Sequence, residues 1–270
     1  YTDEIKEDCW NTSVIIGDID YENINFKKLY SADECVHSVD NVDKIFNAHQ
    51  SGGRIIPFKN DTILLTVGDY RSRHLAQNKE SVNGKIIKID INKNNYEIVS
   101  MGHRNPQGLY FDKDNNIIIE TEHGPNGGDE INLINVSDIE NKEIPNYGWA
   151  ISSAGEHYGG RSLENKKIYQ KYPLHKSHSE HGFIEPLKSF VPSIAISEIV
   201  KVGTDNYVVG SMGKNRDGDK SLYFFDLENK RISNLEQVKV FERIRDLKFY
   251  DNKLYLFMED TASIGIINID

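Results

Sequence analysis

The sequence contains no long apolar run. No stretch of about 18 consecutive apolar residues occurs, so no segment is predicted to span a membrane as a helix. An excess of positive charge is missing as well, since 42 Asp and Glu residues outnumber 32 Lys and Arg residues and leave a formal net charge of −10. Because phosphate binding depends on an excess of Lys and Arg, this balance argues against nucleic acids and anionic membranes as partners.

Cysteine is scarce. The only two, Cys9 and Cys35, either form one disulfide in an oxidising compartment or remain free thiols, and both alternatives stay open. The first residues, YTDEIKEDCW, lack the basic and apolar segments of a signal peptide, so a signal was either removed or never present.

Several motifs of catalysis are also missing. There is no G-x-S-x-G elbow, no P-loop and no G-x-G-x-x-G, which removes support for a serine hydrolase, a P-loop NTPase and an NAD(P) enzyme. A run of three histidines, His175, His178 and His181, has metal-ligand spacing, but no acidic or cysteine pattern accompanies it. We therefore expect this run to lie in an exposed insertion.

Helical periodicity is nearly absent, and short β-rich runs between polar turns replace it. An apolar run, a polar turn and a second apolar run recur in GRIIPFKNDTILLTVGD, GLYFDKDNNIIIETEHG, SEIVKVGTDNYVVGSMG and RDLKFYDNKLYLFMED. The second runs begin at Ile63, Ile117, Tyr207 and Leu254, which are separated by 54, 90 and 47 residues. A third run follows in phase in GKIIKIDI, DEINLINV, SLYFFDL and SIGIINI, and SVIIGDID at 13–20 matches it.

A period of about 45 residues with three or four strands is typical of β-propeller blades. The sequence thus predicts an all-β, six-bladed β-propeller in which residues 1–270 form a single domain, with one unit hidden near 160–190. A β-sandwich with coincidental spacing is the alternative. Because 13–20 matches the third strand of a blade, the chain is expected to begin in mid-blade, without the inner N-terminal strands of the first blade, and to end in such a third strand.

The loops before and after the inner strands carry the functional groups. NAHQSGGR contains His49, GHRNPQGL contains Arg104 and Asn105, and EHGPNGGDEINL is unusually rich in glycine. FERIRDL places Arg243 and Arg245 on one face of a strand. Each feature alone has an ordinary structural explanation, but equivalent positions in successive repeats favour one common site.

GHRNPQGL, EHGPNGGDEINL, NYGW and RIRD, in this order, resemble the soluble quinoprotein aldose (glucose/sorbosone) dehydrogenases. HQSGGRI, TVGD and the AQ…GKIIKI segment agree with the same family. The resemblance implies a six-bladed propeller that uses pyrroloquinoline quinone (PQQ) and calcium. It also implies oxidation of the anomeric hydroxyl of an aldose by hydride transfer to the quinone.

The resemblance also implies roles for single residues. His49 matches the general base, a task that suits an imidazole because its pKa lies near neutrality. Arg104 is expected to stabilise the charge that develops on the quinone oxygens, and Asn105 to hydrogen-bond the cofactor. The remaining expected cofactor ligands are His123, Lys214, Arg243 and Arg245.

Gly124 and Pro125 resemble the residues whose backbone carbonyls ligate the calcium ion, which prefers oxygen. The partners implied are a small sugar and an external electron acceptor, the location is periplasmic or secreted, and the protein is a monomer or homodimer. Two other functions stay open: a noncatalytic propeller that acts as a binding module, and a calcium-dependent propeller hydrolase or lactonase. The base, the arginines and the calcium loop together favour the dehydrogenase.

Overall fold

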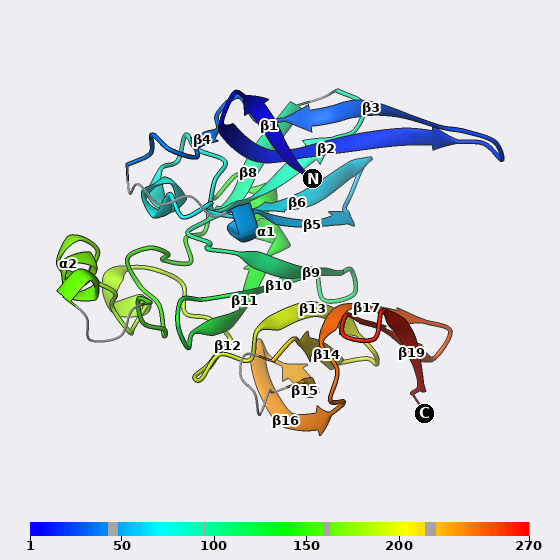
Figure 1. Ribbon diagram of the computed structural model, residues 1–270. Coiled ribbons are helices and arrows are strands. Elements are labelled where there is room, and N and C mark those ends of the chain that lie inside the picture. The colour runs from blue at the N-terminus through cyan, green and yellow to red at the C-terminus, as the bar shows by residue number, and fades with distance from the viewer. Residues whose placement is uncertain (43–47, 94, 159–162, 214–219, 270) are drawn as a thin grey trace.

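The computed structural model describes all residues except 43–47, 94, 159–162, 214–219 and 270 (Figure 1). Its strands form five antiparallel sheets that follow one another along the chain. The first sheet contains β1 (Thr2–Lys6), β2 (Cys9–Ile19), β3 (Ile24–Ser31) and the short β4 (Val36–His37). β2 and β3 form a long hairpin that extends beyond the other sheets (Figure 1).

The next two sheets each have four strands. One contains β5 (Gly52–Pro57), β6 (Thr62–Val67), β7 (Lys85–Asp90) and β8 (Asn95–Met101). The other contains β9 (Pro106–Asp112), β10 (Ile117–Glu122), β11 (Asp129–Asn135) and β12 (Lys188–Phe190).

The last two sheets complete the described chain. They contain β13 (Ile196–Lys201), β14 (Asn206–Ser211), β15 (Ser221–Glu228) and β16 (Arg231–Lys239), and then β17 (Ile244–Tyr250), β18 (Lys253–Met258) and β19 (Ser263–Asn268). The helices are α1 (Val136–Glu140), α2 (Leu163–Lys171) and the 3-10 turns η1 (Ala48–Gln50), η2 (Arg73–Gln77) and η3 (Ser179–His181). Among the residues that the structure describes, neither α-helix is long and apolar enough to cross a bilayer.

Local sequence explains the hairpins. β6 and β10 are rich in Ile, Leu and Thr, which favour pleated, buried strands. Asn60 and Asp61 between β5 and β6, and Asp251 and Asn252 between β17 and β18, all have positive φ values of 51–54°. Tight turns with positive φ at both central residues match the twist of paired strands, and Asn and Asp tolerate that conformation better than most residues.

The hydrophobic cores lie between neighbouring sheets. One cluster joins β10 and β11 to β13, β14 and β15 through residues such as Ile119, Ile131 and Tyr207. A second joins β6 and β7 to β2 and β3, and two more fill the remaining interfaces. Each sheet therefore depends on its neighbours for burial, as expected for the blades of a β-propeller.

The first strands of four sheets lie side by side. β5 contacts β9, β9 contacts β13 and β13 contacts β17. Arg54 on β5 reaches three of these strands: its Nε donates to the carbonyl oxygen of Gln107 at 2.9 Å, and its Nη1 lies 2.8 Å from Glu198 and 3.1 Å from Asp246. These strands therefore surround one axis, and the predicted β-propeller is confirmed.

The predicted hidden unit near 160–190 is wrong. Ile117 on β10 and Tyr207 on β14 lie in neighbouring sheets, so their separation of 90 residues is one period with a long insertion. The described part of that insertion contains α1, α2, η3 and β12, which adds to β11. α2 lies to one side of the sheets (Figure 1). Paired apolar runs are missing there because these residues cover a loop face rather than form a blade.

The beginning of the chain also differs from expectation. Residues 13–20 fall largely within β2, but β1 precedes β2 and pairs with it from Thr2↔Thr12 to Lys6↔Cys9. One strand therefore precedes the matched run, and β2 is the second strand in the order β1-β2-β3. The expectation that the chain ends in a third strand is confirmed, because β19 is third in its sheet.

Candidate active site

One arginine joins the loop before β9 to the loop after β10. Arg104 Nη1 donates to the carbonyl oxygens of His123 and Gly124 at 2.7 Å each. Its backbone N–H donates to the Glu122 carboxylate at 2.5 Å, and the His123 N–H donates to the carbonyl oxygen of Asn105 at 3.1 Å. The structure thus brings together four predicted site residues: Arg104, Asn105, His123 and Gly124.

The Arg104 side chain also borders a small cavity of about 20 Å³. Its lining includes Gln50, Asp69, Arg71, Arg73, Pro125 and Trp149. The guanidinium carbon of Arg104 lies 5.5 Å from the centroid of the Trp149 ring, within the range of a cation–π contact. The cavity therefore combines positive charge with an aromatic wall.

Asp69 is the carboxylate of this cavity and is fully buried. It accepts hydrogen bonds from the Trp149 Nε1–H at 2.7 Å and from the backbone N–H of Arg71 at 2.9 Å. The Gln50 amide, oriented to satisfy both neighbours, donates to Asp69 and accepts from Arg104. Burial raises the pKa of Asp69, and the nearby Arg104 charge opposes that shift.

Sequence reasoning assigned no role to Asp69, Arg71, Arg73 or Trp149. TVGD and NYGW were noticed only as segments of the family resemblance. The available signal was TVGD followed directly by YRSR, because a small polar loop after an inner strand places its side chains at the same face as GHRNPQGL.

His49 lies in η1 and is exposed. Its neighbour Gln50 is buried and lines the cavity beside Arg104. The predicted base therefore belongs to the same loop cluster as Arg104. Its catalytic role stays a prediction.

Arg243, which directly precedes β17, and Arg245 on β17 both reach Glu259. Their place on one face of a strand stays a prediction. Arg243 Nε lies 3.5 Å from that carboxylate, and Arg245 forms a closer ion pair with it. Arg243 Nη1 also donates to the carbonyl oxygen of Met212 at 2.7 Å. Burial lowers the pKa of His123, and the charges of Arg104 and Arg245 lower it further, which places Arg245 near the β10 loop.

Comparison with known proteins decides the family. The family description Glucose / Sorbosone dehydrogenase matches residues 25–267, which is most of the chain. The chain belongs to the glucose/sorbosone dehydrogenase family. The resemblance predicted from the loop motifs is thereby confirmed.

Two relatives illustrate the similarity. The aldose sugar dehydrogenase YliI of Escherichia coli is 27% identical over 242 residues, which are 81% of this chain and 60% of that protein. The quinoprotein glucose dehydrogenase B of Acinetobacter calcoaceticus is 31% identical over 184 residues, or 52% of this chain and 38% of that protein. The chain thus spans about 60% or less of the length of these curated relatives.

Solved structures of glucose/sorbosone dehydrogenases share the fold. The apo form of the soluble aldose sugar dehydrogenase of E. coli superposes with a TM-score of 0.75 at 20% identity, covering 98% of this chain and 76% of that one. The PQQ-bound aldose sugar dehydrogenase of Streptomyces coelicolor gives a TM-score of 0.58 at 18% identity, with 94% and 70% covered.

The carbonyl oxygens of Gly124 and Pro125, the calcium ligands expected from the family, each already accept a hydrogen bond. Gly124 accepts from Arg104, and Pro125 accepts from the Gly128 N–H at 3.2 Å. A carbonyl oxygen has a second lone pair, so its chemistry suits calcium. The guanidinium 2.7 Å from the Gly124 oxygen repels a divalent cation, so calcium at this carbonyl requires Arg104 to move away.

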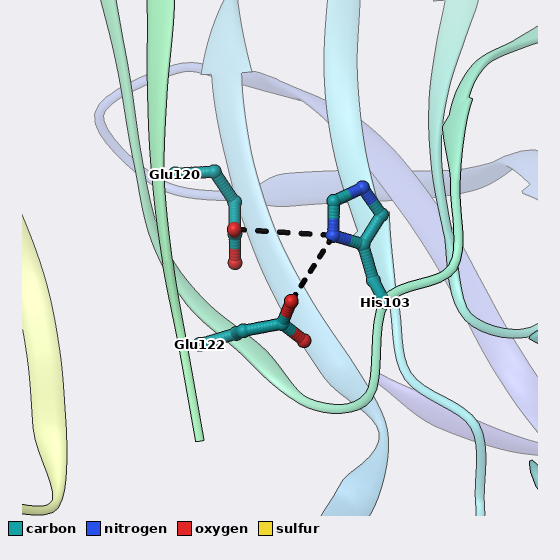
Figure 2. A group of neighbouring side chains, drawn as sticks. All are labelled: His103, Glu120 and Glu122. Atoms are coloured by element: carbon teal, nitrogen blue, oxygen red, sulfur yellow. Dashed lines mark hydrogen bonds and ion pairs between the residues drawn. The ribbon is translucent and has the colours of Figure 1, made fainter. Parts of the chain in front are cut away.

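Glu120 and Glu122 on β10 form a buried cluster with His103 (Figure 2). His103 Nδ1 is 3.4 Å from Glu122 and 3.9 Å from Glu120, and the Asn132 amide donates to both carboxylates at 3.2 and 3.0 Å. The ligand atoms of His103, Glu120 and Glu122 lie within 4.8 Å of one another, a spacing that also suits a metal ion. Burial and the charge of Glu122 raise the pKa of Glu120 well above its usual value. A proton on Glu120 therefore relieves the repulsion between the two carboxylates, as a metal ion would.

Two further predictions concern other loops. Lys214 lies outside the described residues. The histidine run is not an exposed insertion throughout, because His178 is buried, with Nε2 3.5 Å from Glu130 and Nδ1 3.5 Å from Glu185. His175 and His181 stack on each other with centroids 3.7 Å apart, so the run forms part of the packed loop face.

Proposed function

We propose that this chain is a PQQ-dependent dehydrogenase that oxidises the anomeric hydroxyl of aldose sugars. The observation that carries the proposal is the meeting of Arg104, the β10 loop and the η1 loop with His49 in a chain of this family. A quinone cofactor with several carboxylates suits the surrounding donors, because Arg104 and Arg245 supply positive charge near His123 and Arg243 shares Glu259 with Arg245.

His49 takes the proton from the anomeric hydroxyl of the sugar. PQQ, when bound, supplies the acceptor for the hydride. Arg104 stabilises the negative charge that develops in this step, since its guanidinium donates to the carbonyl oxygen of His123 and faces Trp149.

Asn105, His123, Lys214, Arg243 and Arg245 hold the cofactor in this proposal. Arg243 and Arg245 share Glu259, so cofactor carboxylates compete with that side chain for both guanidinium groups. The His123 Nε2–H donates to the carbonyl oxygen of Ile196 at 2.6 Å, which fixes its tautomer and leaves the neutral ring beside the cofactor.

Calcium is the second cofactor in the proposal, held by the carbonyls of Gly124 and Pro125. The oxygen chemistry of both ligands supports it, since calcium prefers oxygen ligands. Cys9 and Cys35 form a disulfide, which supports a periplasmic or secreted location because disulfides persist in oxidising compartments. Electrons then pass to an external acceptor, and the protein works as a monomer or homodimer.

The test is reconstitution of the purified protein with PQQ and calcium, followed by dye reduction with several aldoses. We expect a PQQ absorbance change on binding and sugar-dependent turnover that chelation of calcium abolishes. If neither PQQ binding nor turnover is detected, the dehydrogenase proposal fails and the noncatalytic alternative stands.

Substitution of the base is a sharper test. We expect His49→Ala to lower kcat by roughly 10²- to 10⁴-fold while PQQ stays bound, because only proton transfer is removed. His181→Ala is the matched control, since His181 is also exposed and lies in another 3-10 turn. An unchanged kcat in His49→Ala refutes the assigned role.

A further inference from the structure

Three arginine side chains surround the cavity next to Arg104. Arg71 and Arg73 follow β6 in the YRSR segment, and Arg104 comes from the loop before β9. Asp69 is the one carboxylate among the lining residues that the structure describes. Its two oxygens are already occupied by the Trp149 indole, the Arg71 backbone N–H and the Gln50 amide. The cavity therefore has an excess of positive charge.

Arg71 is the least satisfied member of this group. Its backbone has a φ of 67°, a conformation that favours glycine, and it holds the side chain over the Tyr158 ring at 5.9 Å from the centroid. Its Nε is buried and has no hydrogen-bond partner among the described residues. A buried charged donor without a partner is destabilising, so this position indicates a ligand that the protein alone does not supply.

The positive charges of Arg73 and Arg104 next to Arg71 also favour a bound anion. Burial lowers the pKa of Arg71, and the charges of Arg73 and Arg104 lower it further. Arg73 packs against aromatic rings, 5.2 Å from the Tyr172 centroid and 5.9 Å from that of Trp149, and cannot move freely away from them. An anion between the three guanidinium groups would remove their mutual repulsion.

The position of the cavity distinguishes substrate from cofactor. Arg243 and Arg245, two of the arginines proposed to hold the cofactor, are not among the described residues that line this cavity. Gln50 in the cavity wall directly follows His49, so a group bound here lies beside the proposed base.

We infer that this cavity binds an anionic substituent of the sugar, so that the substrate class is acidic aldoses, with a carboxylate or a phosphate on the sugar. This inference rests on the proposed function. A volume of about 20 Å³ accommodates only a water-sized group or two, so the charged group enters while the sugar ring stays outside. A planar guanidinium such as that of Arg71 pairs with either anion in fork geometry.

The experiment compares kcat/KM of the reconstituted protein for glucuronate, glucose 6-phosphate and glucose. We expect an acidic sugar to be preferred over glucose, and the two acidic sugars distinguish a carboxylate from a phosphate. Arg71→Gln should lower the ratio of acidic to neutral kcat/KM by roughly 10- to 100-fold, as for loss of a hydrogen bond to a charged group. Arg71→Lys, which keeps the charge, should retain part of the preference.

Arg231→Gln is the charge-matched control, because Arg231 is exposed on β16 and should leave the ratio unchanged. A second readout is binding of glucuronate and glucose 6-phosphate to the apo-protein by calorimetry and by Trp149 fluorescence, which we expect to depend on Arg71. A ratio that is the same in Arg71→Gln and wild type overturns the inference. Weaker PQQ binding in Arg71→Gln without sugar also overturns it, since the cavity would then serve the cofactor.

These outcomes separate the two proposals. Turnover of neutral aldoses without any Arg71-dependent preference leaves the dehydrogenase proposal standing and rejects the acidic substrate. Absence of PQQ binding and turnover, together with Arg71-dependent binding of an acidic sugar to the apo-protein, rejects the dehydrogenase and supports the anion site.

Discussion

Glu120 is a carboxyl group enclosed by protein on all sides. It is fully buried next to Glu122, Glu130 and His103, and its Oε1 has no hydrogen-bond partner among the described residues. Burial, followed by the charge of Glu122, raises its pKa well above that of the unfolded chain. Ionisation of Glu120 is therefore less favourable in the folded than in the unfolded state.

This shift predicts a pH dependence of stability. Because the folded pKa is raised, the stabilisation is fully present below the unfolded pKa of about 4.5 and is lost as pH rises through the folded value. Glu120→Gln, which mimics the protonated form, should reduce the loss of stability that urea unfolding measures as pH rises above about 4.5. Glu228→Gln, an exposed substitution on β15, is the control, and equal pH profiles for wild type and Glu120→Gln would contradict the prediction.

At the scale of elements, the first sheet is closed by a covalent link. Cys9 at the start of β2 is joined to Cys35 just before β4, and β4 pairs with β2 from Cys9↔His37 to Trp10↔Val36. The disulfide therefore links the start of β2 to the segment between β3 and β4. A crosslink of this kind acts mainly by restricting the unfolded chain.

We expect the double substitution Cys9→Ala and Cys35→Ala to lower the free energy of unfolding by about 3 kcal/mol, from the closure of a loop with a sequence separation of 26 residues. Thermal and urea unfolding measure the change. Reducing agent should destabilise the wild type and leave the double variant unaffected. An equal effect of reductant on both proteins would contradict this assignment.

Most strands were predictable from the sequence. The runs around Ile63, Ile117, Tyr207 and Leu254 became β6, β10, β14 and β18, because β-branched residues between Asn and Asp turns specify hairpins locally. The helices of the insertion after β11 were not predictable, since this segment lacks the paired apolar runs that mark the other strands.

At the scale of the whole molecule, Arg54 connects the strands around the axis. It contacts β9, β13 and β17 through Gln107, Glu198 and Asp246, although these residues lie up to 192 positions away in the chain. Burial raises the pKa of Glu198 to about 7, against the opposing charge of Arg54. The ion pair therefore strengthens as pH rises past neutrality.

Arg54→Met should destabilise the protein by about 3 kcal/mol at pH 8, because it leaves the Glu198 carboxylate buried without its partner. The effect should be smaller at pH 6, where Glu198 is largely protonated, and Glu198→Gln in the same chain should recover part of the loss. Urea unfolding at both pH values measures these differences. Lys59→Met, which removes an exposed pair with Glu140, is the control, with an expected change of less than about 1 kcal/mol.

The sequence by itself determined the class of fold, the strand pairs and most of the loops that meet at the site. These features follow from local periodicity and from motifs whose residues stand close together in the chain. Only the tertiary structure decided that Arg104 binds the Gly124 carbonyl and that Glu259 pairs with both Arg243 and Arg245. It also decided that Arg71 lines the same cavity as Gln50, the residue that follows His49. Such contacts join different strands and loops, and their charge and burial depend on how the blades pack around the axis.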